Sequence, residues 1–177
     1  MGTYFLRSRR LGFRTWTAAD RDLAVGLWCD PAVTRWFGGP FDEEWAVRRL
    51  AAEMAHQETH GYQYWPLFRL DDGTHVGCCG LHPREPAARI GSFGFHLRRE
   101  HWGRGYATEA ARTAIRFAFE VLDVRSLFAG HHPRNLASRH VLDKLGFHYT
   151  HDELYPPTGL QHRSYLLDAT APAREPS

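Results

Sequence analysis

The sequence is poor in cysteine, in long apolar runs and in net charge, and each shortage argues against a class of protein. Three cysteines among 177 residues are too few and too odd in number for a secreted disulfide framework, so we expect reduced thiols in a cytoplasmic protein. We find neither a secretory leader nor an apolar run of the roughly 20 residues that span a bilayer, and expect no membrane partner. A formal net charge of +2 does not argue for nucleic acid, and we expect none as a partner.

The composition that is present, 43% apolar and 14% aromatic, is sufficient for the core of one domain. Hydrophobic periodicity, turn residues and caps predict a mixed α/β fold with one core. Strands are expected at 11–16, 62–70, 74–82, 90–97, 125–132, 147–154 and 162–169, and helices at 17–28, 42–60, 106–122 and 135–145. We assign the domain to residues 1–168 and a frayed, disordered tail to residues 169–177.

A glycine-containing stretch joins the strand at 90–97 to the helix that starts near Tyr106. The first amides of a helix lack partners and attract anions, and Gly103 and Gly105 allow close approach while Arg104 adds a cation. A phosphate or pyrophosphate is the expected ligand, and a simple tight turn is the alternative. Thr108 occupies the place of the third glycine in the dinucleotide fingerprint, and the Gly-Lys-Ser/Thr of a P-loop is absent, so both of those sites are disfavoured.

The run W-G-R-G-Y-A-T-E-A at 102–110, followed by N-L-A-S at 135–138 and K-L-G-F at 144–147, resembles the GNAT superfamily of N-acetyltransferases. Within it, the likeness is greatest to the Rim-type (RimJ/RimL-like) ribosomal-protein N-terminal acetyltransferases. The resemblance implies a twisted mixed sheet of about seven strands flanked by about four helices. Its fourth and fifth strands, here 90–97 and 125–132, would splay apart to hold the pantetheine arm of acetyl-CoA, the co-substrate.

The resemblance also implies which residues hold acetyl-CoA. The main chain around Phe95 and Leu97 would pair with the pantetheine amides and bind the thioester oxygen. Asn135 matches a family position that contacts the cofactor, although it also suits the N-cap of the following helix. The pyrophosphate would be held by the amides of Trp102, Gly103, Arg104, Gly105, Tyr106, Ala107 and Thr108.

For catalysis, the resemblance favours direct attack of an amine in a ternary complex, with no acyl-enzyme. Many relatives protonate the leaving thiolate with a tyrosine four residues after Ser138, but this chain has Leu142 there, so we assign the role to Ser138. Many relatives carry a glutamate where this chain has Ser92. His96 lies on the same strand face and is our candidate general base, titrating near pH 7; a merely pocket-lining histidine is the alternative, and His132 is a second candidate.

The acceptor is less constrained by the sequence. We expect a primary amine, either a protein N-terminus or a small molecule, and a pocket that prefers small or partly apolar amines because the N-terminal helices and the loop at 155–159 are rich in aromatic residues. The same aromatics could belong to the core instead. No metal site is expected, because the pair His56 and His60 lacks the glutamate and third ligand of a zinc helix. A homodimer is compatible with the family, and an acyl-CoA-binding sensor without catalysis is the alternative function.

Overall fold

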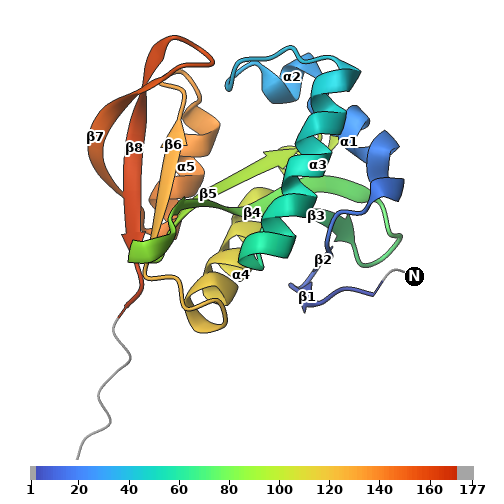
Figure 1. The fold of residues 1–177 in the computed structure, drawn as a ribbon, viewed down its shortest axis with the longest axis horizontal. Coiled ribbons are helices and arrows are strands. Elements are labelled where there is room, and N and C mark those ends of the chain that lie inside the picture. The colour runs from blue at the N-terminus through green and yellow to red at the C-terminus, as the bar shows by residue number, and fades with distance from the viewer. Residues whose placement is uncertain (1–2, 171–177) are drawn as a thin grey trace, which may run out of the picture.

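The computed structural model describes residues 3–170 as one eight-stranded sheet with helices on both faces (Figure 1). The α-helices are α1 (Arg21–Trp28), α2 (Pro31–Thr34), α3 (Glu43–His60), α4 (Tyr106–Glu120) and α5 (Leu136–Leu145). Three short 3₁₀ helices lie at Ala18–Asp20, Pro86–Ala88 and Arg99–His101. The strands are β1 (Leu6–Arg7), β2 (Leu11–Phe13), β3 (Tyr64–Arg69), β4 (His75–Glu85), β5 (Ile90–Leu97), β6 (Ser126–His131), β7 (His148–Tyr155) and β8 (Leu160–Asp168).

The sheet has the order β1-β2-β3-β4-β5-β6-β8-β7, and β5 and β6 form its single parallel pair among the described residues. These two strands pair only from Ile90 to Ser92 on β5 and from Ser126 to Phe128 on β6. Beyond that point β5 continues to pair with β4 alone, and β6 with β8 alone. The sheet therefore opens into a gap between β5 and β6, as expected for the splayed pair.

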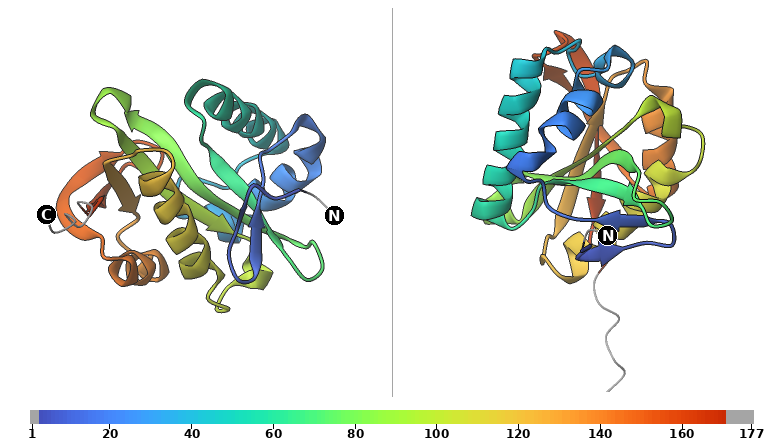
Figure 2. Two further views of the ribbon diagram at one scale, coloured as in Figure 1. Left: turned by 90° about the horizontal axis from the view of Figure 1, so that it is seen from below. Right: turned by 90° about the vertical axis from the view of Figure 1, so that its right-hand side faces the viewer.

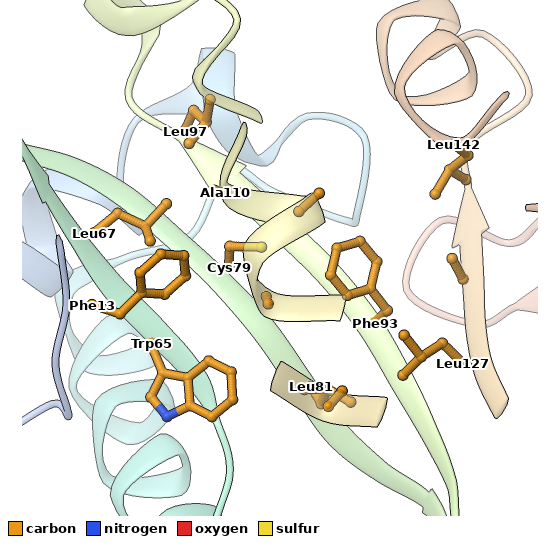
Figure 3. Close-up of a cluster of buried hydrophobic side chains, with 14 of the residues drawn as sticks. Phe13, Trp65, Leu67, Cys79, Leu81, Phe93, Leu97, Ala110, Leu127 and Leu142 are labelled. Atoms are coloured by element: carbon orange, nitrogen blue, oxygen red, sulfur yellow. The ribbon is translucent and has the colours of Figure 1, made fainter. Parts of the chain in front are cut away.

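Side chains alternate between the two faces of the sheet and build two apolar clusters. The larger cluster packs β2 to β6 against α4, with Leu81, Phe93 and Leu127 at its centre (Figure 3). The smaller cluster packs α1 and α3 on the opposite face around Trp28 and Tyr64. Figure 2 shows α3 and α4 on opposite sides of the strands.

Caps set the ends of the helices that frame this gap. Asp42 accepts a hydrogen bond from Trp45 N at the start of α3, and Gly61 ends that helix in the left-handed region at φ 78°. Asn135 and Gly146 do the same for α5. These caps agree with the sequence-based assignment of both helices.

The predicted α/β class, the order of the elements and the seven predicted strands are confirmed, and two elements were missed. The first is β1, a two-residue edge strand too short to have its own periodicity, which raises the strand count to eight. The second is α2, a single turn that starts with Pro31 and is capped by Asp30, which raises the helix count to five. The predicted first strand is shorter than expected, ending at Phe13. The proposed tail lies outside the described residues from position 171 onward.

Candidate active site

A cavity of about 960 Å³ lies where β5 and β6 separate. It is lined by residues of β5, β6, α4 and α5, and it extends to α2, α3, β4 and the β7–β8 hairpin. The cavity brings together the site residues predicted from the sequence, with one exception: Arg104 is exposed and does not line it. The lining residues among them are Phe95, His96, Leu97, Trp102, Gly103, Gly105, Tyr106, Ala107, Thr108, Asn135 and Ser138.

The glycine stretch adopts the conformation that an anion cradle requires. Gly103 and Gly105 have φ angles of 71° and 76°, in the left-handed region, and α4 starts at Tyr106 directly after Gly105. Among residues 3–170, no hydrogen bond is donated by the amides of residues 103 to 108 to a protein acceptor. A Cβ at Gly103 would meet nothing within 4 Å, and one at Gly105 would meet only Arg10 Nη2, at 3.5 Å, so the protein leaves space beside both glycines. The stretch therefore fits a phosphate or pyrophosphate, favoured further by the helix dipole.

The edge of β5 offers polar main-chain groups to the same cavity. Arg98 N donates to Val76 O of β4, and because antiparallel pairing alternates, the main-chain groups of Phe95 and Leu97 point away from β4 into the gap. One of them, Leu97 O, accepts a hydrogen bond from Trp102 Nε1 at 2.8 Å, which ties the strand to the glycine stretch. The remaining groups suit the amides of an extended ligand arm such as pantetheine.

Asn135 and Ser138 face the cavity from the start of α5. Asn135 Oδ1 accepts from Ser138 N at 3.2 Å, so its role as N-cap is confirmed, and Asn135 Nδ2 donates to Ser138 Oγ at 2.9 Å. The Ser138 hydroxyl thus keeps its own proton available for a ligand. Leu142, at the position where many relatives carry a tyrosine, is buried in the core.

His96 lies on the cavity wall, but the expectation that it titrates near pH 7 is wrong. Burial, reinforced by the charge of Arg49, lowers the pKa of His96 to about 3. Trp28 Nε1 donates to His96 Nδ1 at 3.1 Å, and the ring of Phe37 stacks on the imidazole. The lone pair on Nδ1 of the neutral ring therefore already accepts a hydrogen bond and is not free to take a proton from a substrate.

The far end of the cavity, away from the glycine stretch, is aromatic and histidine-rich. Trp36 packs against His132, which itself accepts from Arg134 N at 3.1 Å, and Tyr155 stacks on His162. The loop after α2 touches the β7–β8 loop, since a Cβ at Gly38 would lie 2.8 Å from Pro157 Cβ. The two loops lie at the same end of the molecule (Figure 1). Of the aromatics considered for a pocket, Trp36, Phe37 and Tyr155 line the cavity, whereas Trp28 and Trp45 belong to the α1–α3 cluster.

A charged cluster that the sequence analysis did not single out adjoins this cavity. Glu53 of α3 is fully buried and accepts hydrogen bonds from Arg49 Nε at 2.7 Å and from Tyr64 N at 2.8 Å, and it lies 2.8 Å from His82 Nε2. Burial raises the pKa of Glu53, but the contacts with His82 and Arg49 outweigh burial and hold it below its usual value. The i,i+4 spacing of Arg49 and Glu53 is a sequence signal for their pairing, whereas nothing local connects either residue to His82.

No group of three or more histidine, cysteine, aspartate or glutamate side chains within residues 3–170 is arranged to hold a metal ion. Over the same residues, no helix is both long and apolar enough to cross a bilayer.

The comparisons with known sequences agree on the family. Residues 10–148 match the family described as acetyltransferase (GNAT) domain. The protein YkkB of Bacillus subtilis (strain 168) is 30% identical over 135 residues, which are 74% of this chain and 78% of that protein. The FsC-acetyl coenzyme A-N(2)-transacetylase of Aspergillus fumigatus is 31% identical over 157 residues, 80% of this chain and 65% of that protein.

Solved structures share the fold over most of the chain. An acetyltransferase from Agrobacterium tumefaciens str. C58 is 26% identical with a TM-score of 0.76, covering 96% of this chain and 99% of that one. A spermidine N-acetyltransferase from Vibrio cholerae, solved with CoA and spermine, has a TM-score of 0.76 at 15% identity, over 89% of this chain and 95% of that one. RimL, a ribosomal L7/L12 α-N-protein acetyltransferase solved with coenzyme A, has a TM-score of 0.78 at 15% identity, over 91% of this chain and 95% of that one.

The family match covers both the glycine stretch and the α5 motif, and the fold that it implies is the fold observed. GNAT acetyltransferases use acetyl-CoA, and the unpartnered amides after Trp102 suit its pyrophosphate. The chain belongs to the GNAT family of N-acetyltransferases.

Proposed function

We propose that this enzyme transfers the acetyl group of acetyl-CoA to a primary amine by direct attack in a ternary complex. The observation that carries the proposal is one continuous cavity with two unlike ends. One end has six unpartnered amides at a helix N-terminus, and the other is walled by Trp36, Phe37 and Tyr155. A donor and an acceptor could occupy these ends together, which removes the need for an acyl-enzyme.

The residues at the donor end have distinct proposed roles. The amides from Gly103 to Thr108 would bind the pyrophosphate, whereas the predicted Trp102 amide already donates to Arg99 O at 3.2 Å. Arg104 would contribute only through its long-range charge, because it lies outside the lining. The main chain of Phe95 and Leu97 would orient the pantetheine arm. Asn135 would combine its observed capping role with a contact to the donor.

When bound, acetyl-CoA supplies an acetyl carbon that forms a bond to the amine nitrogen as its bond to sulfur breaks. The hydroxyl of Ser138 lines the cavity at the start of α5 and would give a proton to the departing sulfur. His96, neutral and fixed by Trp28, would present its Nε2–H to the cavity as a hydrogen-bond donor and would not act as a base.

The acceptor that fits the far end best is a small or partly apolar amine. The three aromatic side chains offer apolar contact and cation–π surface to such a group. The similar proteins named above act on spermidine and on a ribosomal protein N-terminus, and these remain acceptors to be tested. We also propose a cytoplasmic location, which the free thiols of Cys29, Cys78 and Cys79 suit, and a homodimer is compatible with the family.

Calorimetric titration with acetyl-CoA tests the donor site, with NADH as the control ligand. Gly105→Glu should abolish binding, because the new carboxylate would compete for the amides at the start of α4. The matched control is Gly73→Glu, a glycine of similar φ (72°) with open surroundings in the β3–β4 turn, which should bind normally. Failure of the wild-type protein to bind acetyl-CoA, or equal binding by Gly105→Glu, would contradict the assignment.

Turnover separates the enzyme from the alternative of an acyl-CoA-binding sensor. Release of CoA is followed with a panel of spermidine, phenethylamine, tyramine and short peptides with free N-termini. Turnover with apolar amines above that with polyamines supports the proposed acceptor. Tight acetyl-CoA binding with no turnover of any amine supports the sensor instead.

A further inference from the structure

His82 of β4, which is partly exposed, and Glu53 of α3, which is fully buried, form a pair at the edge of the cavity. Glu53 Oε1 and His82 Nε2 are 2.8 Å apart, and the Glu53 side chain is 0% exposed. The other carboxylate oxygen is held by Tyr64 N, and Arg49 Nε donates to Oε1 at 2.7 Å. Three donors thus fix the carboxylate in one orientation.

The pairing determines where the proton of neutral His82 resides. An ionised carboxylate only accepts hydrogen bonds, so His82 Nε2 must be the donor and Nδ1 must carry the lone pair. Within residues 3–170, no protein group forms a hydrogen bond with Nδ1. The ring stacks on Tyr64 with centroids 3.9 Å apart and an interplanar angle of 11°, which fixes its orientation.

His82 lies beside the point where β5 and β6 separate. Its Cα pairs with Ser92, and Ser92 is the last residue of β5 that still pairs with β6. His82 therefore lies at the point where the gap opens, on the same sheet face as His96. It lines the cavity and its side chain is 21% exposed.

We propose that His82 is the general base of the reaction and that Glu53 is the residue that positions it. The proposal rests on the proposed function, because it requires an amine acceptor in the cavity. The N–H bond of the ammonium breaks, its electron pair stays on the amine nitrogen, and the proton forms a bond to His82 Nδ1. The charge that develops on the ring is balanced by the Glu53 carboxylate across Nε2, and the proton later passes to solvent.

Other ionisable groups surround His82. Arg49 Nη2 lies 3.4 Å from His82 Nε2, and Glu53 Oε1 lies 2.8 Å from the same nitrogen. His56 has its ring centroid 4.8 Å away, and burial lowers the pKa of His56. Tyr64 of β3 stacks on the ring of His82.

Kinetics of two amines of different basicity test the proposal. His82→Gln should lower kcat for phenethylamine, an ammonium at neutral pH, by about 100- to 10,000-fold, with acetyl-CoA binding unchanged. With p-anisidine, which is already neutral at pH 7, the loss should be far smaller because no proton has to be removed before attack. His60→Gln is the matched control. His60 is the last residue of α3 and does not line the cavity, so this variant should behave as wild type. Equal losses with both amines, or no loss with either, would overturn the role of His82.

A spectroscopic measurement tests the pair without turnover. In protein labelled with ¹⁵N-histidine, NMR of the neutral His82 ring should show the proton on Nε2, and Glu53→Gln should weaken that preference while Glu53→Asp partly restores it. A proton on Nδ1 in the wild-type protein would overturn the proposal whatever the acceptor. If the wild-type enzyme binds no acetyl-CoA or acetylates neither amine, the proposed function or its acceptor class is wrong. If the wild-type enzyme is active and His82→Gln has no effect, only the role of His82 is wrong.

Discussion

Histidines of one cavity differ in chemistry because their hydrogen-bond partners differ. His96 accepts from the indole of Trp28 and lies beneath Phe37, so protonation would lose a hydrogen bond in a buried site where the charge of Arg49 also opposes it. His82 instead contacts the Glu53 carboxylate and leaves Nδ1 open. The same residue type thus supplies a neutral wall at one position and a base at the other.

Ser138 gives a prediction at the same scale. Ser138→Ala should lower kcat by about 100-fold or more without weakening acetyl-CoA binding, because only the proton donor is removed. Ser138→Thr keeps a hydroxyl and should retain most of the activity. Steady-state kinetics with phenethylamine, together with calorimetry, measure both effects. Unchanged kcat in the alanine variant would show that water protonates the thiolate.

Helix α5 shows how one element combines a structural and a ligand-binding end. Its first turn is capped by Asn135 and presents Ser138 to the cavity, while Leu142, one turn later, packs into the core. The cap therefore sets the position of the hydroxyl as well as the stability of the helix.

Replacing Asn135 separates these roles. Asn135→Ala should lower the free energy of unfolding by about 0.5–2 kcal/mol, because Ser138 N loses its acceptor. Asn135→Asp keeps an acceptor oxygen and should remain near wild-type stability. Denaturant titrations give the stabilities, and acetyl-CoA titrations of the aspartate variant report on the donor contact. Wild-type stability of the alanine variant would contradict the capping role.

Across the whole molecule, buried neutral histidines make stability depend on pH. Burial, with the nearby charge of Arg98, lowers the pKa of His75 to about 4, and burial with Arg49 lowers that of His96 to about 3. The unfolded chain binds these protons near pH 6.5 whereas the folded chain does not, so stability should fall as pH decreases below about 6.5. The loss for each such histidine is up to about 1.4 kcal/mol per pH unit.

Urea unfolding at pH 7 and at pH 5 measures this effect. The wild-type protein should be less stable at pH 5, and His75→Gln should reduce the difference between the two pH values because one proton uptake on unfolding is removed. A wild-type protein as stable at pH 5 as at pH 7 would contradict the neutral state of these histidines.

The sequence by itself determined the features that depend on neighbours along the chain. Periodicity located α4, the cap Asn135 located the start of α5, and the glycines before Tyr106 indicated the anion cradle and the family. Short elements such as α2 were not predicted, because a single helical turn is too short to show a hydrophobic period.

Only the tertiary structure decided which histidine could act as a base. The Glu53–His82 pair joins residues 29 positions apart across a helix and a strand, and no local pattern connects them. The pKa of His96 likewise depends on Trp28 and Arg49, which reach it from α1 and α3. Local sequence patterns predict helices and turns because the hydrogen bonds of these elements join residues that are close in the sequence. Burial and charge pairing instead depend on how distant parts of the chain pack together.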